Sequence, residues 1–357
     1  MSQTATATAR FLLETRGVSQ ELEAFVVAVR FSRDGASVAF ALGDGTLRVV
    51  RLADTSAWHA VPVHDGAVLA LAADTGTAGF VTGGDDGAFR RIALDGSIPD
   101  GGVTDIARFG MKWVEQVTSF ADPKAKGGGL LACAVGELVH LFDPAGQKLK
   151  EFAYPSAVTG LAFDAKGKRV GASHYNGATL RFVAAKTDTP RLLEWKGSHT
   201  GLAIHPDGDA VVTAMQENAL HGWRLSDGQH MRMSGYPSKS AALSFTRNGK
   251  WLASSGADAM VLWPFFGGGP MGKAPLELAG GDGILCTQVA CHPQQDMVAG
   301  GFADGLVVVA DIGSSRVLPM APPEHGPVSA LAWSPDGARL AFGTENGFAA
   351  VIDLSAR

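Results

Sequence analysis

Residues 330–354 read ALAWSPDGARLAFGTENGFAAVIDL, and residues 29–52 follow the same pattern as VRFSRDGASVAFALGDGTLRVVRL. In each stretch a short apolar strand leads into an Asp-Gly turn, and two further apolar strands follow, separated by a second glycine-containing turn. Asn-Gly and Asp-Gly turns of this second kind are strong signals for a β-hairpin, because their central residues must accept a positive φ. The two stretches therefore predict antiparallel sheets of short strands.

The same unit recurs eight times along the chain, at a spacing of about 40 to 50 residues. A period of this length with several strands per unit is typical of a β-propeller, in which each unit is one blade. We expect an all-β propeller of eight blades, with seven as the alternative because the repeat is weakest around residues 114–140. The last bulky positions of the first strands are Phe31, Ala72, Phe120, Phe163, Ile204, Phe245, Cys291 and Trp333.

The repeat predicts a single propeller domain over residues 1–357. The third strand of the last unit is followed by no further strand, so the fourth strand of that blade must come from elsewhere. We expect it from residues 7–16, since an N-terminal closing strand removes two open sheet edges from the ring. The units are expected to start near residues 25, 67, 114, 157, 199, 239, 284 and 327.

Several of these units resemble WD40 repeats, and the resemblance covers nearly the whole chain. The turns SPDG (334–337) and HPDG (205–208) match the turn after the first strand of that family, and His64 matches its histidine before the first strand. The Trp-Asp pair of the family is degenerate, as in bacterial-type members; Trp223, for example, is followed by Arg224. The resemblance implies a propeller that acts as a scaffold for protein partners.

Composition disfavours several other classes of function. The net charge is −5 and no basic run is present, whereas nucleic-acid binding normally needs a basic stripe. Three cysteines are too few for a disulfide framework. The sequence predicts neither a signal peptide nor a membrane helix, so that we expect a cytoplasmic protein that binds neither nucleic acid nor membrane.

Catalysis is also disfavoured. The first strands of the units are expected to line the channel, and they bring one carboxylate, Glu115, and one cation, Arg30. General acid–base catalysis normally needs two titratable groups at one atom. The loop GGGPMGKA (267–274) lacks the hydroxyl residue of a phosphate-binding loop. We therefore expect a protein that is not an enzyme and has no cofactor, and rank a channel-centred enzyme third among the hypotheses.

Polar and aromatic residues gather in the turns of the fourth to sixth units, which the propeller pattern places on one face, the top. We predict that this face binds another protein or peptide, because Tyr, His and Met on a rigid rim are adaptable anchors. The plain alternative is that turns are polar because they are solvated. The predicted contacts are Tyr175, Asn176, His199, Gln216, Glu217, Tyr236 and Lys239, together with Phe265 and Phe266 from a loop on the opposite face.

A second hypothesis is a metal-binding or metal-delivery protein that uses the same face, since imidazole and carboxylate groups suit zinc. Its ligands would be His174, His199, Glu217 and His221, although their spacing matches no metal motif. The segment 97–113 (SIPDGGVTDIARFGMKW) also departs from the repeat and is a further candidate for a functional insertion.

Overall fold

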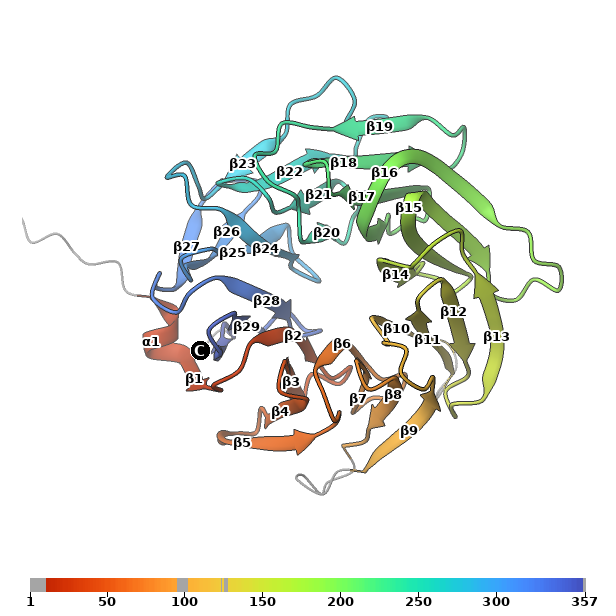
Figure 1. Cartoon of the computed structure of the whole chain (residues 1–357). Helices are drawn as coiled ribbons and strands as arrows, with labels where there is room; N and C mark the ends of the chain where they lie inside the picture. Colours follow the sequence, from red (N-terminus) through yellow and green to blue (C-terminus); the bar gives the residue numbers. More distant parts are fainter. Residues whose placement is uncertain (1–10, 95–101, 123, 125–127, 356–357) are drawn as a thin grey trace, which may run out of the picture.

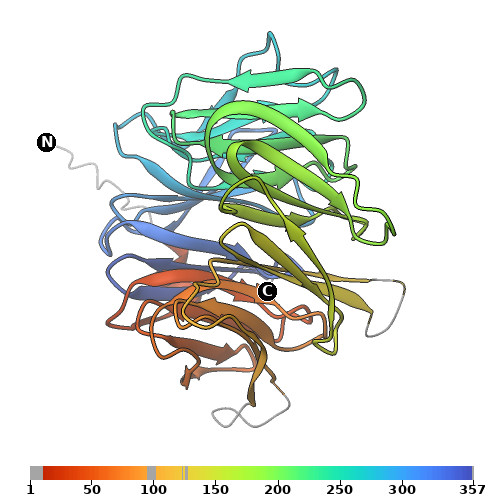
Figure 2. The ribbon, with the colours of Figure 1, turned by 45° about the vertical axis from the view of Figure 1, so that its right-hand side comes forward.

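The computed structural model of the chain describes residues 11–94, 102–122, 124 and 128–355. Its strands form a ring of sheets around a central opening (Figure 1). Turned by 45°, the ribbon shows the sheets succeeding one another around this opening (Figure 2). The architecture is thus an all-β propeller, as the repeat predicts.

Five sheets consist of four consecutive antiparallel strands each. They are β2 (Val26–Phe31), β3 (Ser37–Leu42), β4 (Thr46–Arg51) and β5 (Asp54–Pro62); β6 (Val68–Ala73), β7 (Phe80–Gly84), β8 (Ala88–Ile92) and β9 (Val103–Arg108); β10 (Gln116–Ala121), β11 (Gly129–Val135), β12 (Leu138–Phe142) and β13 (Lys148–Ala153); β20 (Leu243–Phe245), β21 (Trp251–Ser254), β22 (Met260–Pro264) and β23 (Leu276–Leu278); and β24 (Cys286–Cys291), β25 (Met297–Phe302), β26 (Val307–Asp311) and β27 (Val317–Ala321).

One larger sheet holds six strands in the order β14 to β19. Its members are β14 (Gly160–Phe163), β15 (Arg169–Phe182), β16 (Arg191–Ile204), β17 (Ala210–Met215), β18 (Ala219–Arg224) and β19 (His230–Met233). The amide of Val183 donates to the carbonyl of Lys168 at 3.0 Å, which shows that β15 folds back on itself. The reversal lies at Asn176 and Gly177, which both have positive φ.

In the described part of the chain the hydrogen-bonded sheets therefore number seven, the figure of the alternative prediction, and the eight separate sheets of the main prediction are not found there. The difference arises because the fourth and fifth units are joined through β16. The start of β16 pairs with β15 (Leu193 opposite Ala178), whereas its end pairs with β17 (Leu202 opposite Thr213).

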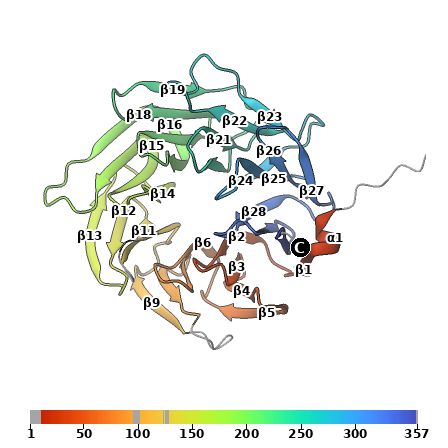
Figure 3. The same cartoon turned by 180° about the vertical axis from the view of Figure 1, so that it is seen from behind.

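The ring closes where the two ends of the chain meet. The seventh sheet has the order β1-β30-β29-β28, with β1 (Gly17–Glu21), β28 (Val328–Trp333), β29 (Arg339–Thr344) and β30 (Phe348–Asp353). The prediction of a closing strand at residues 7–16 was wrong in its position: residues 7–10 lie outside the described part, and Leu12–Arg16 form the helix α1. This helix contacts β27 and β30 and lies beside β27 in Figures 1 and 3.

The sheets are held together by apolar side chains packed between neighbours. β3, for example, is buried along its whole length, because it is a middle strand with sheets on both sides. Phe40 and Leu42 on β3 pack with Val26 and Val29 on β2 and with Ala341 of the closing sheet. The interior of the ring is therefore a continuous series of cores, which fixes the positions of the surface turns.

A channel with a volume of 480 Å³ runs through the centre. Apart from Ala214 on β17, the residues that line it fall in eight segments, each within or beside the innermost strand of a repeat unit: 27–30, 69–71, 115–117, 159–161, 200–202, 241–243, 288–289 and 329–331.

Candidate functional site

Two kinds of connection share the top face of the ring: the turns between the second and third strands of the units, and the connections that lead from an outermost strand to the next innermost strand. Backbone hydrogen bonds join the two kinds. The amide of Phe109 donates to the carbonyl of Gly87 at 2.8 Å, and the amide of Tyr154 donates to the carbonyl of Glu137 at 2.8 Å. The backbone of these turns and connections is thus held in place across the face.

The second-to-third turns give the top face a negative charge. Each of them except the turn at 175–177 carries a carboxylate, and none carries a lysine or an arginine. Some of these groups also hold their own turn and a neighbouring connection; the Asp86 carboxylate, for instance, accepts a hydrogen bond from the amide of Ala88 at 3.1 Å and lies 2.8 Å from Nδ1 of His64. The carboxylates of these turns are Asp44, Asp85, Asp86, Glu137, Glu217, Asp258, Asp304 and Glu345.

The exception is the turn that presents Tyr175. This side chain is 60% exposed, although its backbone is held by a 3.0 Å hydrogen bond from its amide to Ser156 Oγ. The next residue, Asn176, is also exposed, and its Oδ1 accepts a hydrogen bond from the amide of Gly197 at 3.2 Å. The turn therefore displays an aromatic ring on a backbone that is fixed to two neighbouring connections.

The neighbouring turn continues the same surface. Gln216 and Glu217 are both exposed, and Glu217 Oε1 accepts a hydrogen bond from the amide of Ser198 at 3.2 Å. The Asn218 side chain donates to the carbonyl of Pro237 at 3.1 Å. Together these contacts join the turns at 175–177 and 216–218 through the connections that flank them, and Lys239 is exposed on the second of those connections.

Two of the predicted contact residues are buried instead. His199 has no exposed surface, with Nδ1 2.7 Å from Thr213 Oγ1 and Nε2 2.9 Å from the carbonyl of Trp195. Tyr236 is only 8% exposed, and burial raises its pKa to about 12. Neither can touch a partner in this conformation, because their polar atoms are directed into the sheets.

The four residues of the metal hypothesis are not brought together as a metal site. Both nitrogens of His174 are engaged, with the carbonyl of Tyr175 at 2.9 Å and with Thr179 Oγ1 at 2.8 Å. Nε2 of His221 lies 2.9 Å from Nδ1 of His230. Within the described residues, no group of three or more His, Cys, Asp or Glu side chains has an arrangement that could hold a metal ion.

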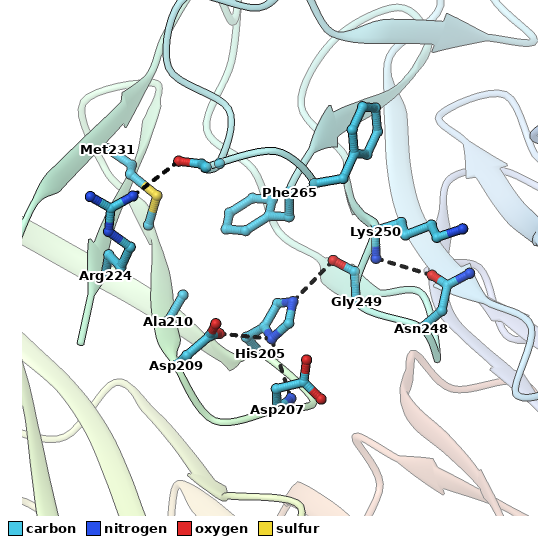
Figure 4. A pocket seen from close by; sticks show the side chains of 13 residues that line it. His205, Asp207, Asp209, Ala210, Arg224, Met231, Asn248, Gly249, Lys250 and Phe265 are labelled. Atoms are coloured by element: carbon cyan, nitrogen blue, oxygen red, sulfur yellow. Dashed lines mark hydrogen bonds and ion pairs between the residues drawn. The ribbon is translucent and has the colours of Figure 1, made fainter. Parts of the chain in front are cut away.

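The loop with Phe265 and Phe266 lies on the opposite face, where it closes over a cavity of 290 Å³ (Figure 4). Phe265 folds inward and packs edge-to-face on Phe245, with ring centroids 5.0 Å apart. Phe266 is 46% exposed. The cavity wall is a mixture of charges, since Nδ1 of His205 lies 2.9 Å from the Asp209 carboxylate.

Sequence reasoning did not single out two further exposed apolar residues on the top face. Met111 is 90% exposed and Trp113 is 56% exposed, both in the connection between β9 and β10. The sequence feature that could have indicated them was the insertion at 97–113, of which residues 97–101 lie outside the described part. Trp113 borders a cavity of 380 Å³ that reaches Glu115 and the turn at 136–137.

Glu115 lines this cavity and the channel, whereas Arg30 lines the channel alone. Within the described residues they form no ion pair with each other. Among the described residues there is also no helix with the length and apolar character required to cross a membrane.

Comparisons with known proteins agree with the architecture. A family model described as the anaphase-promoting complex subunit 4 WD40 domain matches residues 289–356. Telomerase protein component 1 of Mus musculus is 26% identical over 227 residues, which cover 61% of this chain and 8% of that protein. Autophagy-related protein 16 of Arabidopsis thaliana is 25% identical over 155 residues, which cover 41% of this chain and 29% of that protein. The chain thus spans a minor part of these relatives.

Among solved structures, the crystal structure of the computationally designed Ika8 protein is similar to this chain with a TM-score of 0.70. The two are 22% identical, and the similarity covers 94% of this chain and 99% of the designed one, which shows a shared fold. The repeated antiparallel pattern and the WD40 domain model that matches residues 289–356 support the predicted resemblance to WD40 repeats.

Proposed function

We propose that this propeller is a non-catalytic scaffold that binds another protein or peptide through its top face. The observation that carries the proposal is the exposed Tyr175 ring on a turn that is fixed by hydrogen bonds to neighbouring connections. A turn whose backbone is already ordered loses little conformational entropy on binding, and tyrosine is enriched among residues that dominate interface energies.

The composition of the channel supports the non-catalytic part of the proposal. Glu115 and Arg30 are the only charged residues among those that line it. A carboxylate and a guanidinium that always stays protonated do not supply an acid–base pair. A cytoplasmic location and the lack of nucleic-acid binding remain predictions, supported by three unpaired cysteines and by the acidic turns of the top face.

The test is affinity capture of partners from the native host with the purified chain as bait. The doubly substituted variant Tyr175→Ala/Glu217→Ala should lose the proteins that the wild type retains, because it removes the aromatic anchor and a neighbouring carboxylate. Phe266→Ala is the matched control, since it removes an exposed aromatic side chain from the opposite face. Partners that are retained by the double variant and lost by Phe266→Ala would refute a top-face site.

We also infer that the six-stranded sheet functions as two blades, so that the ring has eight. The inference is supported by the eight segments that line the channel and by the hairpin inside β15. An experimental structure tests it: if only one of the segments 159–161 and 200–202 faced the channel, the count would fall to seven.

A further inference from the structure

The connection between β9 and β10 displays two large apolar side chains although its backbone is firmly held. The amide of Val114 donates to the carbonyl of Gly84 at 3.0 Å, and the Val114 side chain is fully buried in the cluster formed with Phe89 and Val135. The same connection leaves Met111 90% exposed and Trp113 56% exposed. Exposed apolar groups on an ordered segment mark a surface for interaction.

Beside Trp113 lies the 380 Å³ cavity, which has carboxylates on two sides. Glu115 stands at the end of the connection, and Glu137 stands in the turn between β11 and β12. This turn is also anchored, because the amide of Val158 donates to the carbonyl of Gly136 at 2.8 Å. An indole ring and two carboxylates around one cavity form an environment that favours a cation.

The rest of the top face also favours a positively charged ligand. All second-to-third turns except that at 175–177 carry a carboxylate, although Asp86 is paired with Arg90 at 3.2 Å. The positive charges of the top-face connections are the three lysines Lys112, Lys196 and Lys239. Lys112 borders the cavity itself and opposes a cation there, so that the wall has two negative groups against one positive group. A basic segment would therefore be attracted to this face, whereas an acidic peptide or a nucleic acid would be repelled.

We propose that the cavity receives an arginine side chain from a basic segment of a partner protein. The guanidinium stacks on the Trp113 ring and pairs with Glu115 and Glu137, while Met111 packs against the apolar part of the segment. Arginine suits the site better than lysine, because its planar group combines stacking on an aromatic face with bidentate pairing to carboxylates. The proposal rests on the proposed function, since it assigns the partner class to the same face.

The test is fluorescence anisotropy with a labelled peptide that alternates arginine and glycine, compared with a peptide that alternates glutamate and glycine. The arginine peptide should bind the wild type, more weakly as salt increases, and the glutamate peptide should not bind. Trp113→Ala should weaken binding about fivefold, and Glu115→Gln/Glu137→Gln about tenfold. Lys112→Ala should strengthen binding about twofold, an effect that a damaged fold would not produce.

Two matched controls locate the effect. Glu345→Gln removes a carboxylate from a different turn of the same face, and Phe266→Ala removes an exposed aromatic side chain from the opposite face; both should change the affinity by less than about twofold. Absence of arginine-peptide binding at low salt, or equal affinities for the wild type and Trp113→Ala, would overturn the proposal.

The affinity-capture experiment distinguishes a failure of the arginine-site proposal from a failure of the proposed function. If captured partners depend on Tyr175 and Glu217 but not on Trp113 and Glu115, the scaffold hypothesis stands and the arginine site is refuted. If partners depend on none of these residues, the top face is not the binding surface and both are refuted.

Discussion

Two connections on the top face each place an aromatic residue in a different environment, one exposed and the other buried. Residues 109–115 lead from β9 to β10 and leave Trp113 56% exposed, whereas residues 234–242 lead from β19 to β20 and leave Tyr236 only 8% exposed. The Tyr236 hydroxyl lies 2.5 Å from Ser254 Oγ and accepts a hydrogen bond from Trp263 Nε1 at 2.6 Å. Both are large aromatic residues in a connection that leads to an innermost strand, but the side chains that surround them differ.

The reason lies in what the neighbouring sheet offers. Beside residues 234–242, Ser254 and Trp263 provide polar partners inside an apolar cluster, so that a tyrosine can be buried with its hydroxyl satisfied. Beside residues 109–115, the interior is already occupied by Val114 and by Phe109, which packs on His140 with ring centroids 4.5 Å apart. The comparison indicates that Tyr236 stabilises the fold and that Trp113 remains available for binding.

Of the variants that test this difference, Tyr236→Ala is expected to lose the most stability. The substitution removes a buried aromatic ring and leaves a cavity, so the free energy of unfolding should fall by about 3–5 kcal/mol. Urea unfolding followed by circular dichroism measures it, with the exposed Tyr175→Ala as the matched control. A loss similar to that of the control would mean that Tyr236 is not part of the packed interior.

A buried histidine on β18 should also make stability depend on pH. His221 is fully buried, its Nδ1 has no hydrogen-bond partner among the described residues, and Trp195 stacks on its ring at 4.0 Å. Burial lowers its pKa to about 3, with the positive field of His230 adding to the effect. The unfolded chain takes up a proton near pH 6.5 while the folded chain does not, so stability falls as the pH decreases from about 6.5 towards 3.

Replacement of His221 by phenylalanine removes this titration and keeps a ring against Trp195. Between pH 7 and pH 5 the wild type should lose about 2 kcal/mol more stability than His221→Phe. Denaturant unfolding at the two pH values gives this difference directly. Parallel losses in the two proteins would show that His221 does not contribute to acid sensitivity.

A smaller loss is expected when only the hydroxyl of Tyr236 is removed. In Tyr236→Phe the Trp263 indole N–H loses its acceptor in a buried position, which should cost about 1–2 kcal/mol of unfolding free energy. The double variant Tyr236→Phe/Trp263→Phe tests the explanation, because it removes the orphaned donor as well. A double variant less stable than the sum of both single losses would contradict the hydrogen-bond account.

The smallest effect on stability is expected for Trp113→Ala, within about 0.5 kcal/mol of the wild type. The indole is mostly exposed, and the connection is held by backbone hydrogen bonds that the substitution leaves in place. Thermal unfolding measures this, with Tyr236→Ala as the contrasting variant. A clear loss of stability would remove the distinction between the two connections.

Much of the fold could be predicted from the sequence because strand period and turn chemistry are local. The Asp-Gly and Asn-Gly turns located the hairpins, and the repeat gave the propeller. The closing strand was misplaced because the apolar pair Leu12 and Leu13 is compatible with a helix as well as with a strand. The packing of this pair against the last blade, which is distant in the sequence, decides between the two. The number of sheets also depends on the pairing of β16 with both β15 and β17. No local sequence pattern shows this pairing.

The candidate site was less predictable, because exposure depends on partners distant in sequence. Tyr175 and Glu217 were chosen from their turns and are exposed. Tyr236 was chosen for its residue type, but its hydroxyl is bonded to residues 18 and 27 positions away. The segment 97–113 was a candidate because it departs from the repeat, but Trp113 was not singled out within it, since its exposure depends on the packing of neighbouring residues.

The sheet that joins β1 to β30 affects how the molecule must be made. Of the strands in the described residues, β1 is synthesised first and its partner β30 is synthesised last; nearby, Ser329 Oγ donates to the carbonyl of Val26 across 303 positions of the chain. Folding of the middle blades can proceed during synthesis, but the ring cannot close until the last blade appears. Until then both end blades expose unpaired strand edges, so this interval is when the protein is most open to chaperones and to association with other unfinished chains.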